Sequence, residues 1–309
     1  MKLHSAKLKG VLRGLHHVTA FAGDAQRNLD FYTNFLGLRL IKRTVNFDDP
    51  ATYHFYFGPA AEPGTIATFF PWPTAPADRA GSGQIPALSF AIPKNSLEYW
   101  IDRARLAKID CSGPDSRFDD AFLTVRDPAG LVVELIARKT TSARPAIVRL
   151  HSVALCVADA EPTGRFLTDL LGFNFAAREN DRARFVLDGA LVDVIAAPGV
   201  DRAKLSSGMV HHVAWRVENE LEQNQWREKL KAAGVRVTRV IDRKYFRSIY
   251  FREPGGVLFE IATDGPGFTV DEPADRLGCA LQLPPWLEPL RESIVRRLPQ
   301  VKLECAGPA

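Results

Sequence analysis

A repeated order of elements constrains the fold of this chain more than any other feature: a short apolar strand, a helix and three further strands. The four opening strands share an apolar pattern that ends at Asp or Asn, with the sequences LHHVTAFAGD, PALSFAIPKN, LHSVALCVAD and VHHVAWRVEN. A helical stretch follows each strand, at residues 26–35, 97–107, 161–170 and 220–232. Repetition of one supersecondary unit predicts a fold assembled from its copies, here four βαβββ modules of about 60 residues.

The borders of the modules can also be placed. Three of the helices are followed by a glycine suited to a left-handed cap, Gly37, Gly172 and Gly234. The predicted modules span about 12–74, 85–138, 148–198 and 209–264. The first two fall within residues 1–140, the last two within 146–265, and residues 266–309 form a tail. After Pro284 the tail carries apolar residues at helical spacing, which predicts an amphipathic helix packed on the protein body. These residues are Trp286, Leu287, Leu290, Ile294 and Leu298.

Composition excludes several classes of protein. Hydrophobic residues make up 46% and charged residues 25% of the 309 residues, the balance of a globular chain. No apolar run approaches the roughly 20 residues of a membrane-spanning helix, and no secretory leader is recognisable, so we expect a cytoplasmic protein without a membrane partner. The 40 basic and 36 acidic residues are spread along the chain, unlike the concentrated basic face of a nucleic-acid binder. Assembly into a homo-oligomer is left open.

Alignment of the opening strands on their terminal Asp or Asn selects candidate metal ligands. Seven residues upstream of that anchor lie His17, Leu88, Ser152 and His212, so that only the first and fourth modules carry histidine there. His151 falls one position earlier. Because a one-residue offset turns a strand side chain to the opposite face, His151 is not expected to be equivalent to the other two histidines.

The closing strands supply a carboxylate in the same way. Four residues after each turn glycine stand Thr68, Glu134, Asp193 and Glu260. If the first and fourth modules share one cup, its inward positions are His17, His212 and Glu260, with Thr68 as a non-ligand. Two histidines and one carboxylate on one face of a metal suit non-haem Fe(II), which keeps open positions for other ligands; Mn(II) is the second candidate. The other two modules offer no imidazole at these positions, so Glu134 and Asp193 are not expected to hold a metal.

Two residues near the closing hairpin of the fourth module could add acid–base chemistry. A turn centred on Gly255 places Tyr250 opposite Glu260, with both side chains on one face of the sheet. A phenol there could exchange a proton with an aromatic hydroxyl on the metal, although a core tyrosine is the alternative. Arg243 lies seven residues before Tyr250, an odd spacing that leaves its direction undecided between a substrate anion and a salt bridge.

Fourfold βαβββ repetition resembles the vicinal-oxygen-chelate superfamily, which includes glyoxalase I, extradiol dioxygenases and bleomycin-resistance proteins. The resemblance implies an α+β fold in which pairs of modules form two cupped, barrel-like mixed sheets, plus the C-terminal helix, with a metal inside the cup shared by modules 1 and 4. Longer strings resemble the ring-cleaving dioxygenases that act on hydroquinones. They are RTVNFDDPATYHFYFG, PGTIATFFPWP, DRKYFRSIYFREPGGVLFEIATDGPGF and LPPWLEPLR.

This family resemblance implies a site and a reaction. The iron ligands of the family map onto His17, His212 and Glu260. Its catalytic residues map onto His211, Arg243 and Tyr250, and its further pocket residues onto His16 and Thr19. The implied reaction is Fe(II)-dependent cleavage of a hydroquinone-type ring, with or without chlorine substituents, or of a catechol, with insertion of both atoms of O2. A small aromatic substrate and O2 are therefore the expected partners.

Two other classes of function stay open at this point. A glyoxalase-type isomerase or lyase would use Ni, Zn or Mn without oxygen, and a fourth protein ligand near Thr68 would favour it. A small-molecule binding protein of the bleomycin-resistance kind would bind no metal, and the shared register of His17, His212 and Glu260 counts against it.

Overall fold

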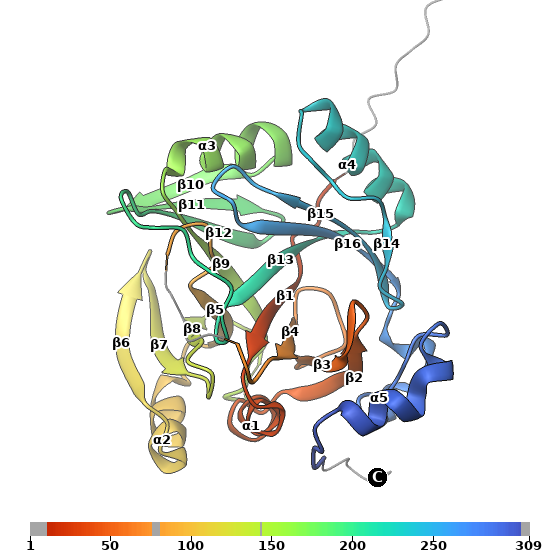
Figure 1. Ribbon diagram of the computed structural model, residues 1–309. Helices are drawn as coiled ribbons and strands as arrows, with labels where there is room; N and C mark the ends of the chain where they lie inside the picture. Colours follow the sequence, from red (N-terminus) through yellow and green to blue (C-terminus); the bar gives the residue numbers. More distant parts are fainter. Residues whose placement is uncertain (1–10, 76–80, 143, 304–309) are drawn as a thin grey trace, which may run out of the picture.

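The computed structural model describes residues 11–75, 81–142 and 144–303 (Figure 1). The first module contains β1 (Leu15–Ala22), α1 (Ala25–Asp30), the π-helical turn η1 (Phe31–Phe35), β2 (Arg39–Asn46), β3 (Asp49–Gly58) and β4 (Ile66–Pro71). The second contains β5 (Ala87–Pro93), α2 (Leu97–Ala107), β6 (Cys111–Arg117), β7 (Asp120–Arg126) and β8 (Val132–Arg138). The third contains β9 (Arg149–Val157), α3 (Ala160–Arg165), the π-helical turn η2 (Phe166–Leu171), β10 (Asn174–Glu179), β11 (Arg182–Leu187) and β12 (Ala190–Ala196). The fourth contains β13 (Val210–Val217), α4 (Glu220–Ala232), β14 (Ile241–Asp242), β15 (Phe246–Arg252) and β16 (Leu258–Pro266).

The strands form two mixed sheets of eight strands each, in agreement with the predicted α+β fold. One sheet has the order β14-β15-β16-β13-β1-β4-β3-β2, and the other has the order β10-β11-β12-β9-β5-β8-β7-β6. The first sheet thus joins strands from the two ends of the chain: in Figure 1 the teal strand β13 lies between the red strand β1 and the blue strand β16. Its centre is the antiparallel pair β1 and β13, in which Thr19 lies opposite His212.

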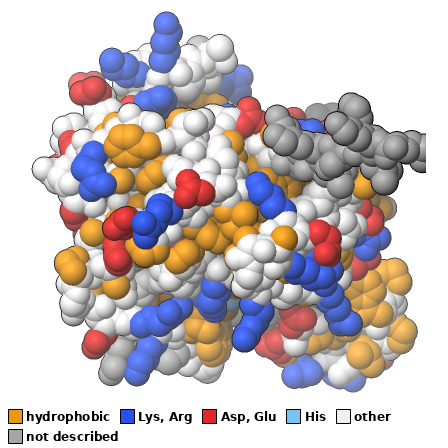
Figure 2. All heavy atoms as spheres, turned by 90° about the horizontal axis from the view of Figure 1, so that it is seen from above, with side chains coloured by type: hydrophobic (Ala, Val, Ile, Leu, Met, Phe, Trp, Pro, Cys, Tyr) orange, Lys and Arg blue, Asp and Glu red, His pale blue; other side chains and the backbone are white. Residues whose placement is uncertain are grey.

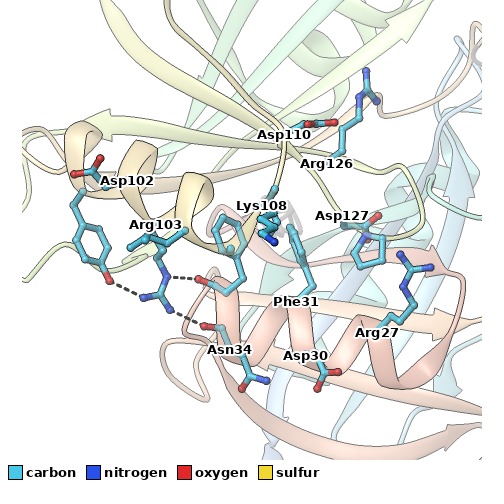
Figure 3. A pocket seen from close by; sticks show the side chains of 16 residues that line it. Arg27, Asp30, Phe31, Asn34, Asp102, Arg103, Lys108, Asp110, Arg126 and Asp127 are labelled. Carbon is cyan, nitrogen blue, oxygen red and sulfur yellow. Dashed lines mark hydrogen bonds between the residues drawn. The ribbon is translucent and has the colours of Figure 1, made fainter.

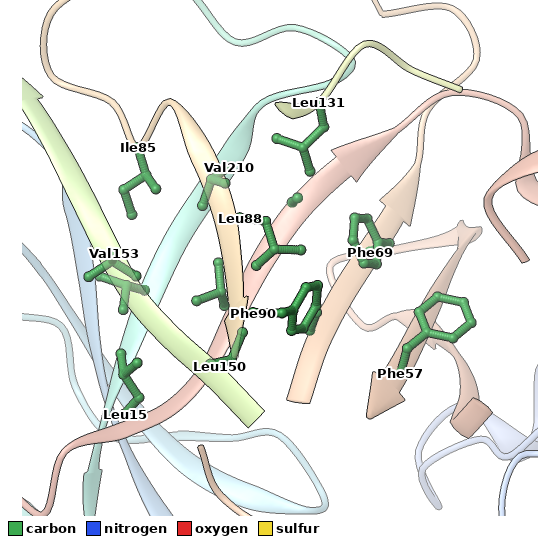
Figure 4. Packing of buried hydrophobic residues seen from close by; sticks show 14 of the residues in the cluster. Leu15, Phe57, Phe69, Ile85, Leu88, Phe90, Leu131, Leu150, Val153 and Val210 are labelled. Carbon is green, nitrogen blue, oxygen red and sulfur yellow. The ribbon is translucent and has the colours of Figure 1, made fainter. Parts of the chain in front are cut away.

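One apolar core lies between the two sheets (Figure 4). It combines large side chains of both sheets, such as Phe69 on β4 and Phe90 on β5, which are fully buried. Because strand side chains alternate between faces, Ala67 and Phe69 enter this core while Thr68 points to the other side of β4. The other side of the first sheet therefore combines polar residues such as Thr68 with a second, smaller apolar cluster that includes Tyr56 and Phe246.

The helices begin and end for local reasons. Asp24, Asp159 and Asn219 accept hydrogen bonds from backbone N–H groups in the first turns of α1, α3 and α4. The cap glycines take positive φ, +85° at Gly172 and +77° at Gly234. The helices at 97–107 and 220–232 have the predicted limits, whereas the other two turn π-helical in their second halves.

The tail differs from its prediction. After the short 3-10 turns η3 (Phe268–Val270), η4 (Ala274–Arg276) and η5 (Glu288–Leu290), α5 covers only Arg291–Arg297. Leu287, Ile294 and Leu298 are buried as expected, but Trp286 and Leu290 are 50% and 54% exposed. Pro289 explains the difference, because proline lacks the N–H group that a continuous helix from Pro284 would need. The predicted end of the tail, 304–309, lies outside the described residues.

The surface mixes charges of both signs. In the view of Figure 2, basic and acidic side chains are interspersed with apolar ones. None of the helices in the described part of the chain has the length and apolar character to cross a lipid bilayer.

Candidate metal centre

Three adjacent strands bring the predicted ligands together. His17 lies on β1, His212 on β13 and Glu260 on β16, and β13 runs between the other two strands. His212 Nε2 is 2.9 Å from Glu260 Oε2, His17 Nε2 is 3.5 Å from the same oxygen, and the two Nε2 atoms are 3.4 Å apart. Among the described residues, this is the only group of three or more potential ligand side chains that converge in this way.

The arrangement of these atoms fits a divalent transition metal. Glu260 is fully buried, and its Oε2 forms no well-aligned hydrogen bond although His212 Nε2 is so close. The donor atoms therefore point towards a common point more than towards one another. An ion with bonds of about 2.0–2.2 Å holds neighbouring ligand atoms about 3 Å apart, and the observed separations of 2.9–3.5 Å are close to that value.

Each predicted histidine ligand is held by the histidine that precedes it. His16 Nδ1 is 2.8 Å from His17 Nδ1, and His211 Nδ1 is 2.8 Å from His212 Nδ1. If Nε2 of His17 offers its lone pair to an ion, its Nδ1 carries the hydrogen and donates it to His16. His16 Nε2 then donates to the carbonyl of Thr263, at 3.1 Å. The HH dipeptide thus supplies one candidate ligand and one orienting partner in each module.

Burial and the contacts among the ligands together set the ionisation of the centre. Burial alone would raise the pKa of Glu260, but its charge contacts and hydrogen bonds with His17 and His212 lower that pKa well below the usual value. Burial also lowers the pKa of His212, and it lowers those of His16 and His211 to about 3. Metals bind the carboxylate form of Glu and the neutral form of His, and the lowered pKa values of Glu260 and His212 favour these two forms.

Beside the triad lies a cavity of about 320 Å³, a size suited to a small molecule. Phe21, Phe47, Phe70 and Phe246 give it aromatic walls. Of the residues predicted to contact substrate, Thr19, His211, Arg243 and Tyr250 border the cavity. The pocket can therefore enclose one aromatic ring next to the triad.

His16 does not border this cavity, so the expectation that it is a pocket residue is corrected. Its ring is 2% exposed and packs on Phe246, with the two centroids 5.0 Å apart. An irregularity in the pairing of β1 with β13 falls between Leu15 and His17. Such a bulge redirects the side chain at the extra residue, and here His16 supports His17 from behind.

Tyr250 and Arg243 meet at the edge of the cavity. Tyr250 pairs with Glu260 across β15 and β16, the register that the hairpin turn predicts. Arg243 Nε donates to Tyr250 Oη at 3.2 Å, and Arg243 Nη1 donates to Asp48 Oδ2 at 2.9 Å. Burial raises the pKa of Tyr250, while Arg243 acts in the opposite direction. Arg243 therefore faces the site and a salt-bridge partner at once.

Sequence reasoning missed several residues of the site. His54 on β3 and Tyr56 border the cavity, and Ser248 donates to Glu260 Oε1 at 2.5 Å. The available signal was a single histidine in the otherwise aromatic strand YHFYF, with Tyr56 opposite Thr68. The place of His54 in the site depends on the pairing of β3 with β4, which the local sequence does not reveal.

The second sheet fills the corresponding positions with ion pairs. Glu134 accepts from Arg117 at 2.7 Å, and Asp193 accepts from Arg184 at 2.7 Å. His151 lies there beside Ser152, with Nδ1 2.9 Å from the hydroxyl oxygen. These two carboxylates are thus paired with arginines.

A larger cavity, about 920 Å³, lies elsewhere, between η1 and α2 (Figure 3). Its wall contains none of the predicted site residues. Arg103 spans it and donates to the backbone carbonyls of Phe35 and Asn34, each at 2.6 Å. This arrangement fastens a helix of the second module to one of the first.

Comparison with known proteins places the chain in a family. Residues 14–135 and 149–261 match the model of the Glyoxalase/Bleomycin resistance protein/Dioxygenase superfamily. The chain is 38% identical over 298 residues to "Putative ring-cleaving dioxygenase MhqO" of Bacillus subtilis, covering 92% of this chain and 95% of the relative. It is 32% identical over 314 residues to "Chlorohydroquinone/hydroquinone 1,2-dioxygenase" of Sphingobium indicum, covering 93% and 96%.

Comparison with solved structures supports the same family assignment. The crystal structure of a "putative dioxygenase" from Bacillus subtilis has a TM-score of 0.90 at 37% identity, covering 95% of this chain and 99% of that one. Glyoxalase I from Zea mays shares the fold, with a TM-score of 0.63 at 17% identity, covering 81% and 92%. The chain therefore belongs to the glyoxalase/bleomycin resistance protein/dioxygenase superfamily, among relatives named as ring-cleaving dioxygenases.

Proposed function

We propose that this protein is an Fe(II)-dependent dioxygenase that cleaves the ring of hydroquinone-type aromatics and inserts both atoms of O2. The observation that carries the proposal is the convergence of His17, His212 and Glu260 beside an aromatic-walled cavity. The names of two relatives, one of them a hydroquinone dioxygenase, support the substrate class.

The donor set favours iron and oxygen chemistry over isomerisation. A glyoxalase-type isomerase would be expected to have a fourth protein ligand at the position of Thr68. The Thr68 hydroxyl instead forms hydrogen bonds with Thr19 at 2.8 Å and with His54 at 2.9 Å. Two histidines and one carboxylate leave positions open for exogenous ligands. When bound, Fe(II) supplies the one-electron chemistry that allows an aromatic and O2 to react, and Mn(II) is the alternative ion.

The remaining residues would bind the substrate and handle its protons. The phenylalanine walls hold the ring and exclude water from it. Tyr250 Oη, a neutral phenol that Arg243 contacts, is placed to exchange a proton with a substrate hydroxyl. His211 Nδ1 is occupied by His212, so Nε2 is the nitrogen left to exchange a proton with a molecule in the cavity.

The test is anaerobic reconstitution with Fe(II), followed by oxygen-electrode assays with hydroquinone, chlorohydroquinones and catechols. We expect one O2 to be consumed for each ring-opened product. Lack of oxygen uptake across this panel, with the metal demonstrably bound, would overturn the proposed reaction. Turnover of a substrate without oxygen would favour the isomerase class instead.

Paired variants test the site itself. His17→Ala should abolish metal binding, because it removes one of three ligands. His151→Ala is the matched control, since His151 occupies the neighbouring register position in the second sheet, and it should bind metal like the wild type. The reverse result would overturn the assignment of the centre to the first sheet.

A further inference from the structure

A chain of four hydrogen-bonding side chains crosses the wall of the cavity on three adjacent strands, β3, β4 and β1. Tyr56 Oη is 3.0 Å from His54 Nδ1, and His54 Nε2 is 2.9 Å from Thr68 Oγ1. Thr68 Oγ1 is in turn 2.8 Å from Thr19 Oγ1. We call this chain the hydroxyl–imidazole relay, composed of Tyr56, His54, Thr68 and Thr19.

We propose that the hydroxyl–imidazole relay binds the ring hydroxyl of the substrate that does not face the metal, and so selects 1,4-dihydroxy aromatics. The inference rests on the aromatic substrate class proposed above. It assigns His54 and Thr68 a positioning role, since they act on the substrate through the two ends of the relay.

The relay has one hydrogen more than its three internal hydrogen bonds use. With a neutral imidazole, the four groups carry four hydrogens and share three hydrogen bonds. One hydrogen is therefore left at one end as a free donor, while the other end keeps a free acceptor. Reversal of all three bonds exchanges the two ends. Because burial lowers the pKa of His54 well below its usual value, the neutral imidazole is the form present.

Both ends of the relay and His54 reach the cavity, whereas Thr68 does not. Thr19 and Tyr56 border the cavity together with His54, and Thr68 is fully buried behind them. The His54 ring is held between Phe70 and Tyr56, with centroids 4.1 and 4.2 Å away. The relay is thus a fixed wall element that can donate to a hydroxylate or accept from a hydroxyl.

The spacing of His17 and Thr19 along β1 is on the scale of a single aromatic ring. Thr19 follows His17 by two residues on β1, so the two side chains share a face and their Cα atoms are about 6.6 Å apart along the strand. One benzene ring with an oxygen at each end has a length of the same order. A substrate with one hydroxyl at the centre can therefore place its opposite hydroxyl at the relay.

The experiment compares hydroquinone with 4-methylphenol, which has nearly the same shape but lacks the second hydroxyl. Binding of each to metal-loaded protein is measured by calorimetry without oxygen, and kcat/KM for hydroquinone is measured separately. The variants are Thr68→Val, which interrupts the relay at nearly constant volume, Thr68→Ser, which keeps the hydroxyl, and His54→Phe, which keeps the ring packing. Metal content is determined for all four proteins.

We expect the wild type to bind hydroquinone about tenfold more tightly than 4-methylphenol, as one good hydrogen bond predicts. Thr68→Val and His54→Phe should lose this preference and raise KM more than they change kcat, with metal content unchanged. Thr68→Ser should keep the preference.

The outcomes separate the relay from the proposed reaction. Absence of a preference in the wild type, or its persistence in Thr68→Val and His54→Phe, would overturn the relay whether or not oxygen is consumed. Loss of the preference in Thr68→Ser as well would do the same, because it would indicate a packing effect. A preference that requires the relay, in a protein that consumes no oxygen, would support the relay and refute the dioxygenase.

Discussion

Replacement of His16 by phenylalanine tests how the candidate metal centre is held. The His16 ring contacts His17 Nδ1 at 2.8 Å and the carbonyl of Thr263 at 3.1 Å, and it packs on Phe246. His16→Phe preserves an aromatic ring in this buried place but removes both hydrogen bonds. His17 then keeps its own position in the sheet but loses the partner that fixes its tautomer and orientation.

The expected magnitude follows from that lost contact. Removal of a partner that orients a metal ligand typically weakens metal binding by about 10- to 100-fold, which corresponds to about 1.4–2.7 kcal/mol. An independent argument agrees, since a buried N–H left without its acceptor costs about 1–3 kcal/mol. Because His16 lies outside the cavity wall, the shape of the cavity should not change.

The assay is competition between the metal-free protein and a chelator of known affinity, with Fe(II) under anaerobic conditions and with Mn(II). His151→Phe is the matched control, because His151 is a buried histidine at the related position of the second sheet. Wild-type affinity in His16→Phe would refute the orienting role of His16. An equal loss in His151→Phe would show that the effect is a general loss of stability.

Three further predictions concern the centre, a buried carboxyl and the core. Glu260→Gln should weaken metal binding by about 100-fold or more, because it removes a ligand and its charge, whereas Glu134→Gln should retain the metal after dialysis; retention by both would contradict the site. Burial raises the pKa of Asp127 to about 6, so the folded state takes up its proton more readily than the unfolded state. The wild type should therefore lose up to about 3 kcal/mol of stability as pH rises from about 4 to 7, and Asp127→Asn should lack this loss in urea titrations; identical pH dependence of the two proteins would count against it. Phe69→Ala should lower the free energy of unfolding by about 3–5 kcal/mol, because Phe69 is fully buried and its ring centroid lies 4.2 Å from that of Tyr32. A loss below about 1 kcal/mol would mean that the core re-forms around the gap.

Prediction from sequence succeeded where structure depends on local pattern. Helix limits at 97–107 and 220–232 follow from apolar periodicity and from flanking caps such as Asn219. The tail was mispredicted because its apolar spacing ignores Pro289, which interrupts the helix that the pattern suggests. The π-helical halves of two helices carry no signal in the apolar spacing.

Prediction of the metal site likewise succeeded where it relied on strand periodicity within the four repeats. Strand periodicity applied to four repeats singled out His17, His212 and Glu260, which the fold brings within 3.5 Å of one another. The expectation that His16 lines the pocket came from the family resemblance and not from strand periodicity; its ring lies against His17 and Phe246, outside the cavity wall.

The sequence by itself determined the four modules, most of their helices and the three positions that converge, since all of these depend on spacing within short segments repeated along the chain. Only the tertiary structure decided which groups hold and surround those positions. Thr19 and Thr68 are 49 residues apart, and Arg243 and Asp48 are 195 apart. Thr19 meets Thr68 because β1 pairs with β4. Arg243 meets Asp48 because the curled sheet brings the region after its edge strand β14 to the turn between β2 and β3, a closure that no local pattern encodes.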